Sequence, residues 1–387
     1  MKSLPLVLIF LAALIVSESQ ANNCPKYQVE RVAEGLGVPW GMALLDPNTL
    51  LITERGGQLL KLDLASGKHT QIKGLPPIHA KGQGGLLDIK LGPNVSNTSS
   101  DLDSNTESDS SNPQWLYFTY SKPVAGQGRT TIARAQLLGN ELVNWQDLLV
   151  TESATDTNRH FGSRIAFDDK GHLFFSVGDR GHRPNGQDLT THAGSILRLN
   201  LDGTRPHDNP FVTGTNKNNS DALPEIYSYG HRNPQGLAYD MKNQRLWAIE
   251  HGPRGGDEIN LIKPGHNYGW PEVSFGKEYW GPISVGEGTF KEGMEPPTKV
   301  YTPSIAPSSL LVYSGLAFTE WQGNLLSGAL KLTHLNRVTL GGDQATSEER
   351  LLTELNERIR QVIEDDQGYL LISTDSGNIY RLRPCGV

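Results

Sequence analysis

The sequence predicts an all-β fold, a six-bladed β-propeller built from four-stranded antiparallel blades. Helical periodicity is scarce in the 387 residues, and short apolar or alternating runs end at Gly, Asp, Asn or Pro. The 42 glycines and 23 prolines indicate many turns between short strands. A unit of strand, turn, strand, turn and strand recurs about six times, as expected for blades around an axis. A sandwich or barrel is the alternative, and the long repeat period disfavours it.

The repeated units follow one another along the chain. Each has an apolar run, a turn containing Asp or Asn, a second apolar run and a turn containing Gly. The clear units span residues 38–64, 163–203, 234–265 and 359–384, and two looser units span 84–123 and 310–340. Two inserts interrupt this order. A polar, Ser/Asn/Asp-rich loop occupies about 94–112, and a Gly/Pro-rich segment at 279–304 is expected between the fourth and fifth units.

The first 21 residues have the pattern of a secretory signal peptide. Lys2 starts it, about 13 apolar residues follow, and Ser19-Gln20-Ala21 resembles a cleavage site. A buried N-terminal helix is the alternative. No later stretch is apolar enough to span a membrane. We therefore expect residues 22–387 to form a single propeller domain that is periplasmic or secreted, with no membrane insertion.

Two cysteines lie near opposite ends of the chain, Cys24 and Cys385. In an oxidising compartment such a pair predicts a disulfide. A propeller must join its first and last blades, and this bond would lie at that closure. Two unrelated thiols are the alternative.

Charge and missing motifs exclude several function classes. The net charge is −7 and no basic run occurs, so binding to nucleic acid or an anionic membrane is not expected. The glycine-rich signatures of dinucleotide and P-loop sites are absent, as is the Gly-x-Ser-x-Gly elbow of hydrolases. The sequence has no Cys/His cluster of the kind that binds zinc.

Several polar residues recur near one phase of the repeat, just before a strand or at its end. In a propeller such positions converge on the mouth of the central channel. A ring of cations there would suit an anion with several carboxylates or phosphates. For each residue alone, a surface salt bridge is the alternative. The residues are Gln83, His160, Arg232, Asn233, Lys331, Arg358 and Arg360.

The segment 251–272 suits a hard cation, because carboxylates stand beside glycine-rich turns whose carbonyls are accessible. The carbonyls of Gly252 and Pro253 could hold one calcium ion, and Glu258 with the Tyr268 carbonyl could hold another. The alternative is a turn in which the acidic residues only cap backbone groups.

The ordered motifs GQGGLLD, HFGSRIAFD, GHRNPQGL, EHGPRGGDEIN, NYGWP, YTPSIAPS, GALK and RIR resemble those of soluble aldose sugar dehydrogenases that depend on pyrroloquinoline quinone (PQQ). They are also similar to soluble quinoprotein glucose dehydrogenase. The resemblance runs from about Val29 to Leu382. It implies a six-bladed propeller that oxidises aldose sugars with PQQ and calcium. Arg159 stands where the glucose dehydrogenase branch has an acid, which favours the aldose sugar branch.

The resemblance also implies residue roles. His160 would be the general base, and Arg232 and Asn233 would contact the quinone and its developing charge. Lys331, Arg358 and Arg360 would bind the carboxylates of the cofactor, and Gln83 and Asp375 would line its pocket. The Gly252 and Pro253 carbonyls would bind the calcium ion that contacts PQQ. Glu258 and Tyr268 would bind a second calcium ion.

Two other classes remain open at this point. A calcium-dependent lactonase would use the calcium and the histidine but leave the cations of Lys331, Arg358 and Arg360 without a task. A non-catalytic propeller that binds a protein or glycan would be expected to have lost the histidine or the cation ring. Neither the preferred sugar nor the electron acceptor is specified by the sequence.

Overall fold

The computed structural model of the chain describes residues 26–93, 114–212 and 221–386. The expected signal peptide at 1–21, Cys24 and the 94–112 insert lie outside the described residues.

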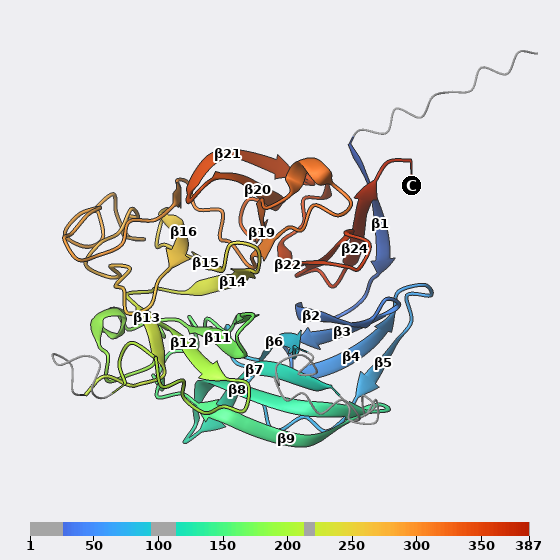
Figure 1. Ribbon diagram of the computed structural model, residues 1–387, viewed down its shortest axis with the longest axis horizontal. Helices are drawn as coiled ribbons and strands as arrows, with labels where there is room; N and C mark the ends of the chain where they lie inside the picture. The colour runs from blue at the N-terminus through green and yellow to red at the C-terminus, as the bar shows by residue number, and fades with distance from the viewer. Residues whose placement is uncertain (1–25, 94–113, 213–220, 387) are drawn as a thin grey trace, which may run out of the picture.

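Six four-stranded antiparallel sheets stand around a central axis, which confirms the predicted propeller (Figure 1). Blade 1 consists of β2 (Pro39–Asp46), β3 (Thr49–Glu54), β4 (Gln58–Asp63) and β5 (His69–Ile72). Blade 2 consists of β6 (Leu86–Leu91), β7 (Trp115–Val124), β8 (Gln127–Leu138) and β9 (Glu141–Val150). Blade 3 consists of β10 (Ile165–Phe167), β11 (His172–Val177), β12 (Ser195–Asn200) and β13 (Ile226–Tyr229).

Blade 4 consists of β14 (Pro234–Asp240), β15 (Arg245–Glu250), β16 (Asp257–Ile262) and β17 (Lys299–Tyr301). Blade 5 consists of β18 (Leu311–Val312), β19 (Leu325–Ala329), β20 (His334–Gly341) and β21 (Gln344–Leu351). Blade 6 combines β22 (Ile359–Glu364), β23 (Leu370–Thr374) and β24 (Ile379–Pro384) with β1 (Tyr27–Ala33) from the other end of the chain. Short 3₁₀ turns occur at η2 (Arg183–Gln187), η3 (Thr319–Trp321) and η4 (Thr353–Leu355). Within the described ranges no helix is long and apolar enough to cross a membrane.

The ring closes where β1 pairs antiparallel with β24, for example Tyr27 with Pro384 and Arg31 with Tyr380. Figure 1 shows β1 and β24 side by side in blade 6. Cys385, just after β24, is disulfide-bonded. Its pairing with Cys24 stays a prediction, since Cys24 is outside the described residues.

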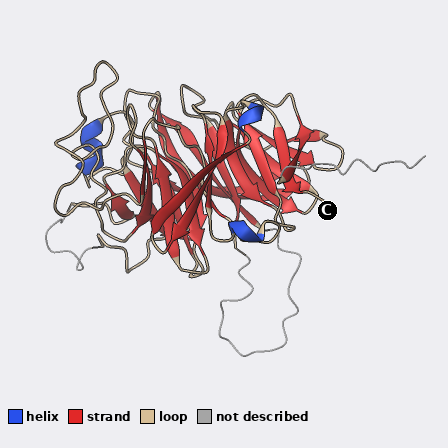
Figure 2. Cartoon of the chain, turned by 90° about the horizontal axis from the view of Figure 1, so that it is seen from above, coloured by secondary structure: helices blue, strands red, loops and turns tan. Residues whose placement is uncertain are grey.

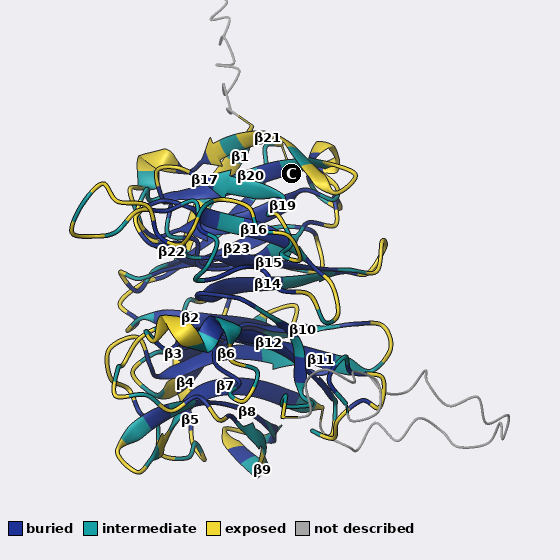
Figure 3. Ribbon diagram, turned by 90° about the vertical axis from the view of Figure 1, so that its left-hand side faces the viewer, coloured by how far each residue is buried: buried dark blue, intermediate teal, exposed yellow. Residues whose placement is uncertain are grey.

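Apolar side chains fill the six interfaces between neighbouring blades, and the buried strands are visible in Figure 3. Between blades 1 and 2, for example, Leu51 and Ile89 pack with Phe118. Between blades 3 and 4, Phe174 packs with Ala248. Each buried Leu or Phe contributes about 1.5–3 kcal/mol, so these interfaces hold the ring together.

The centre of the ring is occupied by the buried side chain of Arg164, just before β10. Its Nη1 lies 3.0 Å from Oδ1 of Asp88 on β6, and its guanidinium stacks 3.8 Å from the Trp40 ring. It also donates to main-chain oxygens of the other four blades. These are Trp40 (3.3 Å), Gln235 (3.0 Å), Ser308 (2.6 Å) and Arg360 (3.1 Å). One side chain thus joins the inner edges of all the blades.

The Gly/Pro-rich insert lies inside blade 4, and the prediction that it separates the fourth and fifth units was wrong. β17 pairs with β16 as the outer strand of that blade, with Asp257 opposite Tyr301. The segment from 279 therefore belongs to the connection from β16 to β17. A strand of three residues is too short for its periodicity to reveal it.

Candidate active site

The site lies on one end of the propeller, because antiparallel strands bring certain loops together. The start of a blade's first strand and the end of its second strand lie on the same face. Figure 2 shows the strands running between two layers of loops. In blade 3 this places His160, before β10, beside Asp179, after β11.

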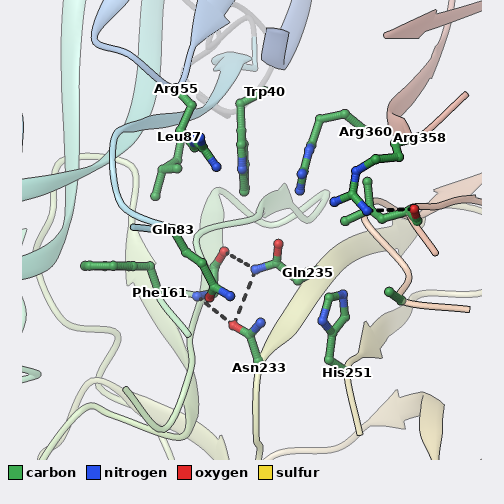
Figure 4. Close-up of a pocket in the computed structure, with 13 residues that line it drawn as sticks. Trp40, Arg55, Gln83, Leu87, Phe161, Asn233, Gln235, His251, Arg358 and Arg360 are labelled. Carbon is green, nitrogen blue, oxygen red and sulfur yellow. Dashed lines mark hydrogen bonds between the residues drawn. The ribbon is translucent and has the colours of Figure 1, made fainter. Parts of the chain in front are cut away.

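A cavity of about 180 Å³ opens at the axis among these loops (Figure 4). Arg358 and Arg360 approach from blade 6, and Arg55 approaches from blade 1. Polar amides and the His251 imidazole line the rest of the wall, and Trp40, Leu87 and Phe161 supply apolar surface. Of the predicted residues, Gln83, Asn233, Arg358 and Arg360 line this cavity.

His160 is fixed at its ring and at its backbone. Its residue has φ 55°, its backbone N–H donates to Oε1 of Gln83 at 2.7 Å, and its Nδ1 donates to Oδ1 of Asp179 at 2.6 Å. With Nδ1 bonded to a carboxylate, the other nitrogen, Nε2, carries the lone pair. Burial lowers the pKa of His160, the Asp179 bond opposes this, and the charge of Arg232 adds to the lowering, so the net pKa is below its ordinary value.

Asp179 was not among the predicted residues. Besides His160, its carboxylate accepts from Trp270 Nε1 at 2.8 Å and from the Gly181 backbone at 2.7 Å. Burial raises the pKa of Asp179, but the His160 hydrogen bond and charge outweigh it, so the net pKa is lowered. Asp179 therefore stays a carboxylate and holds the His160 ring in one tautomer and orientation.

Arg232 and Asn233, just before β14, lie on the same side of the site. Nη1 of Arg232 donates to the carbonyls of Gly252 at 2.8 Å and His251 at 3.1 Å, and its guanidinium lies 5.3 Å from the Trp270 ring. Oδ1 of Asn233 accepts from the Gly162 backbone at 3.2 Å. Arg232 thus connects the His160 loop, through Trp270 and Asp179, with the predicted calcium segment.

Arg358 and Arg360 both bind Asp375, which follows β23. Asp375 Oδ2 accepts from Nε of Arg358 and Nη2 of Arg360, each at 2.9 Å. Burial raises the pKa of Asp375, but the bonds and charges of Arg360 and Arg358 outweigh it and hold the pKa below its usual range. One carboxylate between two guanidinium groups leaves a net positive charge facing the cavity.

Lys331, like Arg232, is a predicted cation that does not line this cavity. Its side chain is exposed, while its neighbour Leu330 lines the cavity and also accepts a bond from Arg358 at 2.8 Å. Lys331 lies at the rim, where a long side chain can still turn inward.

The predicted calcium segment forms a second cavity, beside Arg232, lined by Gly252, Glu258 and Tyr268. Glu250 stands opposite Glu258 in the β15–β16 register and lines it too. Burial and the Glu250 charge raise the pKa of Glu258 well above its usual range. Pro253 is buried outside this lining.

The donors of this second cavity fit a hard cation. Asn260 does not line the cavity, but it bonds both glutamates through its amide nitrogen, and its Oδ1 is buried with no hydrogen-bond partner in the described part of the chain. Two facing carboxylates with a lone amide oxygen match the oxygen ligands that calcium takes. The same ranges hold no group of three His, Cys, Asp or Glu placed for a metal, so backbone carbonyls would have to complete the shell.

Of the two acidic residues Asp257 and Glu258, only Asp257 fits the alternative to a metal site, in which an acidic side chain caps backbone groups of a turn. Its carboxylate accepts from the backbones of Gly252 and Ala306, each at 2.9 Å, and from Oγ of Ser304 at 2.7 Å. Glu258, one residue on, faces the opposite way toward Glu250.

Comparison with known proteins gives the family. The sequence profile described as "Glucose / Sorbosone dehydrogenase" matches residues 36–381. The chain belongs to this family. It is 36% identical over 384 residues to aldose sugar dehydrogenase YliI of Escherichia coli strain K12, which covers 97% of this chain and 98% of that protein.

Solved structures agree with this family. The apo-form of the soluble aldose sugar dehydrogenase from Escherichia coli is similar with a TM-score of 0.84 and 35% identity, over 92% of this chain and 99% of that one. The PQQ-bound form of an aldose sugar dehydrogenase from Streptomyces coelicolor is similar with a TM-score of 0.72 and 28% identity, over 92% and 98% of the two chains.

Sequence reasoning missed several residues that share one signal. Each follows the second strand of its blade, the end of a strand that faces the site. They are Arg55 after β3, Asp179 after β11 and His251 after β15. The prediction named Lys331 and Asp375 after the second strands of blades 5 and 6, but not the matching positions in blades 1, 3 and 4.

Proposed function

We propose that this protein oxidises aldose sugars at the anomeric carbon to the lactone, using PQQ and calcium. The observation that carries the proposal is the pair His160–Asp179, 2.6 Å apart, set beside Arg232 and next to a cavity with three arginines on its wall. This oxidation needs a general base, a pocket that binds an anionic cofactor, and a cationic side chain that stabilises the negative charge formed during the reaction.

His160 is proposed as the general base. Its Nε2 would take the proton of the hydroxyl at C1, while Asp179 holds the proton on Nδ1 and stabilises the imidazolium that forms. Because its pKa lies below the ordinary value, His160 is neutral and ready to accept a proton at neutral pH. Gln83 fixes the backbone of His160, which keeps the imidazole in place.

Bound PQQ would supply an electrophilic quinone to accept the hydride from C1, a chemistry that no protein side chain offers. Arg358, Arg360 and Arg55 would bind its carboxylates, with Lys331 at the rim. Arg232 would stabilise the negative charge that develops on the quinone side.

We assign the proposed calcium ions to two sets of donors. The Gly252 and Pro253 carbonyls would hold the ion next to the cofactor; the Gly252 carbonyl accepts one bond from Arg232 here and has a second lone pair for the ion. Glu258 and Tyr268 would hold the second ion. The unpartnered Oδ1 of Asn260 and the carboxylate of Glu250 support that second site.

The N-terminal pattern of residues 1–21 supports export, so we propose that the protein works in the periplasm or outside the cell. Its partner would be a small aldose, and a separate electron acceptor would remove the electrons. No interaction with nucleic acid is proposed, given the net charge of −7.

A hydrolase is less well supported. Ser228, His231 and Glu250 form a Ser–His–Glu chain, with 2.9 Å from Oγ to Nε2 and 2.9 Å from Nδ1 to Oε1. Ser228 is fully buried and lines neither cavity, so it cannot reach a substrate. The chain instead orients Glu250. A non-catalytic binding module would leave His160–Asp179 without a use.

The experiment is an optical titration. The purified protein is loaded with PQQ and calcium, aldoses are added one at a time, and the absorbance of the reduced quinone is followed. Reduction by at least one aldose, abolished when calcium is chelated before loading, is the expected result. Tight PQQ binding without reduction by any aldose would remove the sugar oxidation. Hydrolysis of a lactone by the PQQ-free protein would favour the hydrolase.

A further inference from the structure

The imidazole of His251 lines the axial cavity and carries a hydrogen-bond acceptor with no partner in the described part of the chain. The residue follows β15 and lines the cavity beside Asn233 and Arg360 (Figure 4). Its Nε2 lies 2.6 Å from the Pro307 carbonyl oxygen. A carbonyl can only accept, so the proton of the ring is on Nε2 and Nδ1 carries a lone pair.

A turned ring would lose the Pro307 bond. Besides the Pro307 bond, the backbone N–H of His251 donates to the Asn233 carbonyl at 3.2 Å, and its own carbonyl accepts from Arg232 at 3.1 Å. The geometry therefore keeps Nδ1 an acceptor.

Most other polar groups around the cavity donate or are already engaged. Arginine side chains have no acceptor at all. The side-chain oxygens of Gln83 and Asn233 already accept backbone N–H groups, from His160 and Gly162. Gln235 directs its amide nitrogen to the Gly162 carbonyl at 3.0 Å, which leaves its Oε1 as a second acceptor. A ligand N–H in this cavity would therefore find, among the described residues, acceptors that make no other bond at His251 and Gln235.

We infer that Nδ1 of His251 accepts a hydrogen bond from the pyrrole N–H of bound PQQ. This inference rests on the proposed function. The carboxylates, quinone oxygens and pyridine nitrogen of PQQ are all acceptors and match the arginines. Its pyrrole N–H is its one N–H donor, and the Pro307 bond sets the direction of the lone pair on Nδ1 of His251.

Two variants separate this role from a structural one. In His251→Gln the longer amide can reach the position of Nε2 and donate to Pro307, but nothing replaces Nδ1. In His251→Asn the shorter amide can offer its oxygen near the Nδ1 position, but it cannot reach Pro307. Each apo-protein is titrated with PQQ in saturating calcium by calorimetry, and thermal unfolding and calcium affinity are measured in parallel.

For His251→Gln we expect PQQ affinity to fall by about five- to tenfold, the effect of one neutral hydrogen bond, with the melting temperature and calcium affinity unchanged. For His251→Asn we expect a lower melting temperature and PQQ affinity closer to that of the wild type. Unchanged PQQ affinity in His251→Gln, or an equal loss in both variants, would overturn the inference. If the wild-type protein does not bind PQQ, the proposed function fails with it, and the two failures are thereby told apart.

Discussion

Replacing Arg164 by Met should destabilise the whole ring, because this side chain touches every blade. The change keeps a long apolar stem and removes the guanidinium, leaving Asp88 buried without its partner 3.0 Å away and depriving four blades of a main-chain bond. Burial lowers the pKa of Arg164 to about 10, with Asp88 opposing, so the group is still charged at neutral pH. Breaking a buried ion pair at one partner costs about 3–5 kcal/mol.

The carbonyls add to this loss but not in full, because water can reach some of them through the cavities. We therefore expect at least about 4 kcal/mol of lost unfolding free energy. At about 2.1 cal/mol/K of unfolding entropy per residue, this lowers the melting temperature by about 5 °C. Calorimetry and urea unfolding measure both quantities.

A double-mutant cycle with Asp88→Leu provides the control. The double variant should be more stable than the sum of the two single losses predicts, because neither charge is then left alone. A loss below about 1 kcal/mol for Arg164→Met, or strictly additive losses in the cycle, would refute the view that the pair is coupled at the ring centre.

Four further outcomes are expected. His160→Ala should lower turnover by about 10²–10⁴-fold while PQQ affinity stays near the wild-type value; a variant with more than half of the wild-type turnover would exclude His160 as the base. Because burial and Arg232 lower the pKa of His160, kcat/KM should hold constant down to below about pH 6.5, the ordinary imidazole range, and fall beneath it as the base is protonated; a fall that begins above neutral pH would contradict this. Lys331→Ala should weaken PQQ binding more than sugar saturation, and an unchanged PQQ affinity in a titration would remove Lys331 from the cation ring. Cys24→Ser should lower thermal stability with little change in catalysis, and two reactive thiols in the unfolded, unreduced wild-type protein would disprove the predicted disulfide.

The inner part of each blade could be predicted from the sequence, and the outer part could not. The repeat located three strands of each unit, and the fourth strand of each blade was expected only from the propeller architecture. The fourth strands are exposed and often polar, such as β5 with one buried residue in four and β21 with one in eight. These strands are held by backbone pairing to the third strand more than by burial of one face. Their sequences therefore show little alternation of apolar and polar residues.

The candidate site divides in a similar way. Residues before a first strand or at its start, such as His160 and Arg360, were predicted because the turn pattern fixes their phase. Asp179 and His251 were missed, although they share the phase at the ends of second strands. Their roles depend on partners from distant segments of the chain. Asp179 accepts a hydrogen bond from Trp270, and His251 bonds the Pro307 carbonyl. A local sequence pattern cannot predict such contacts.

The closure of blade 6 also sets an order of events during synthesis. Glu30 on β1 pairs with Arg381 on β24, a residue made 351 positions later. Until β24 emerges, β1 is an unpaired strand, and an unpaired edge can associate with other chains. Folding of the ring can therefore finish only once nearly the whole chain has been made, and a chain exported N-terminus first would need its β1 shielded on the far side of the membrane while the remaining blades arrive.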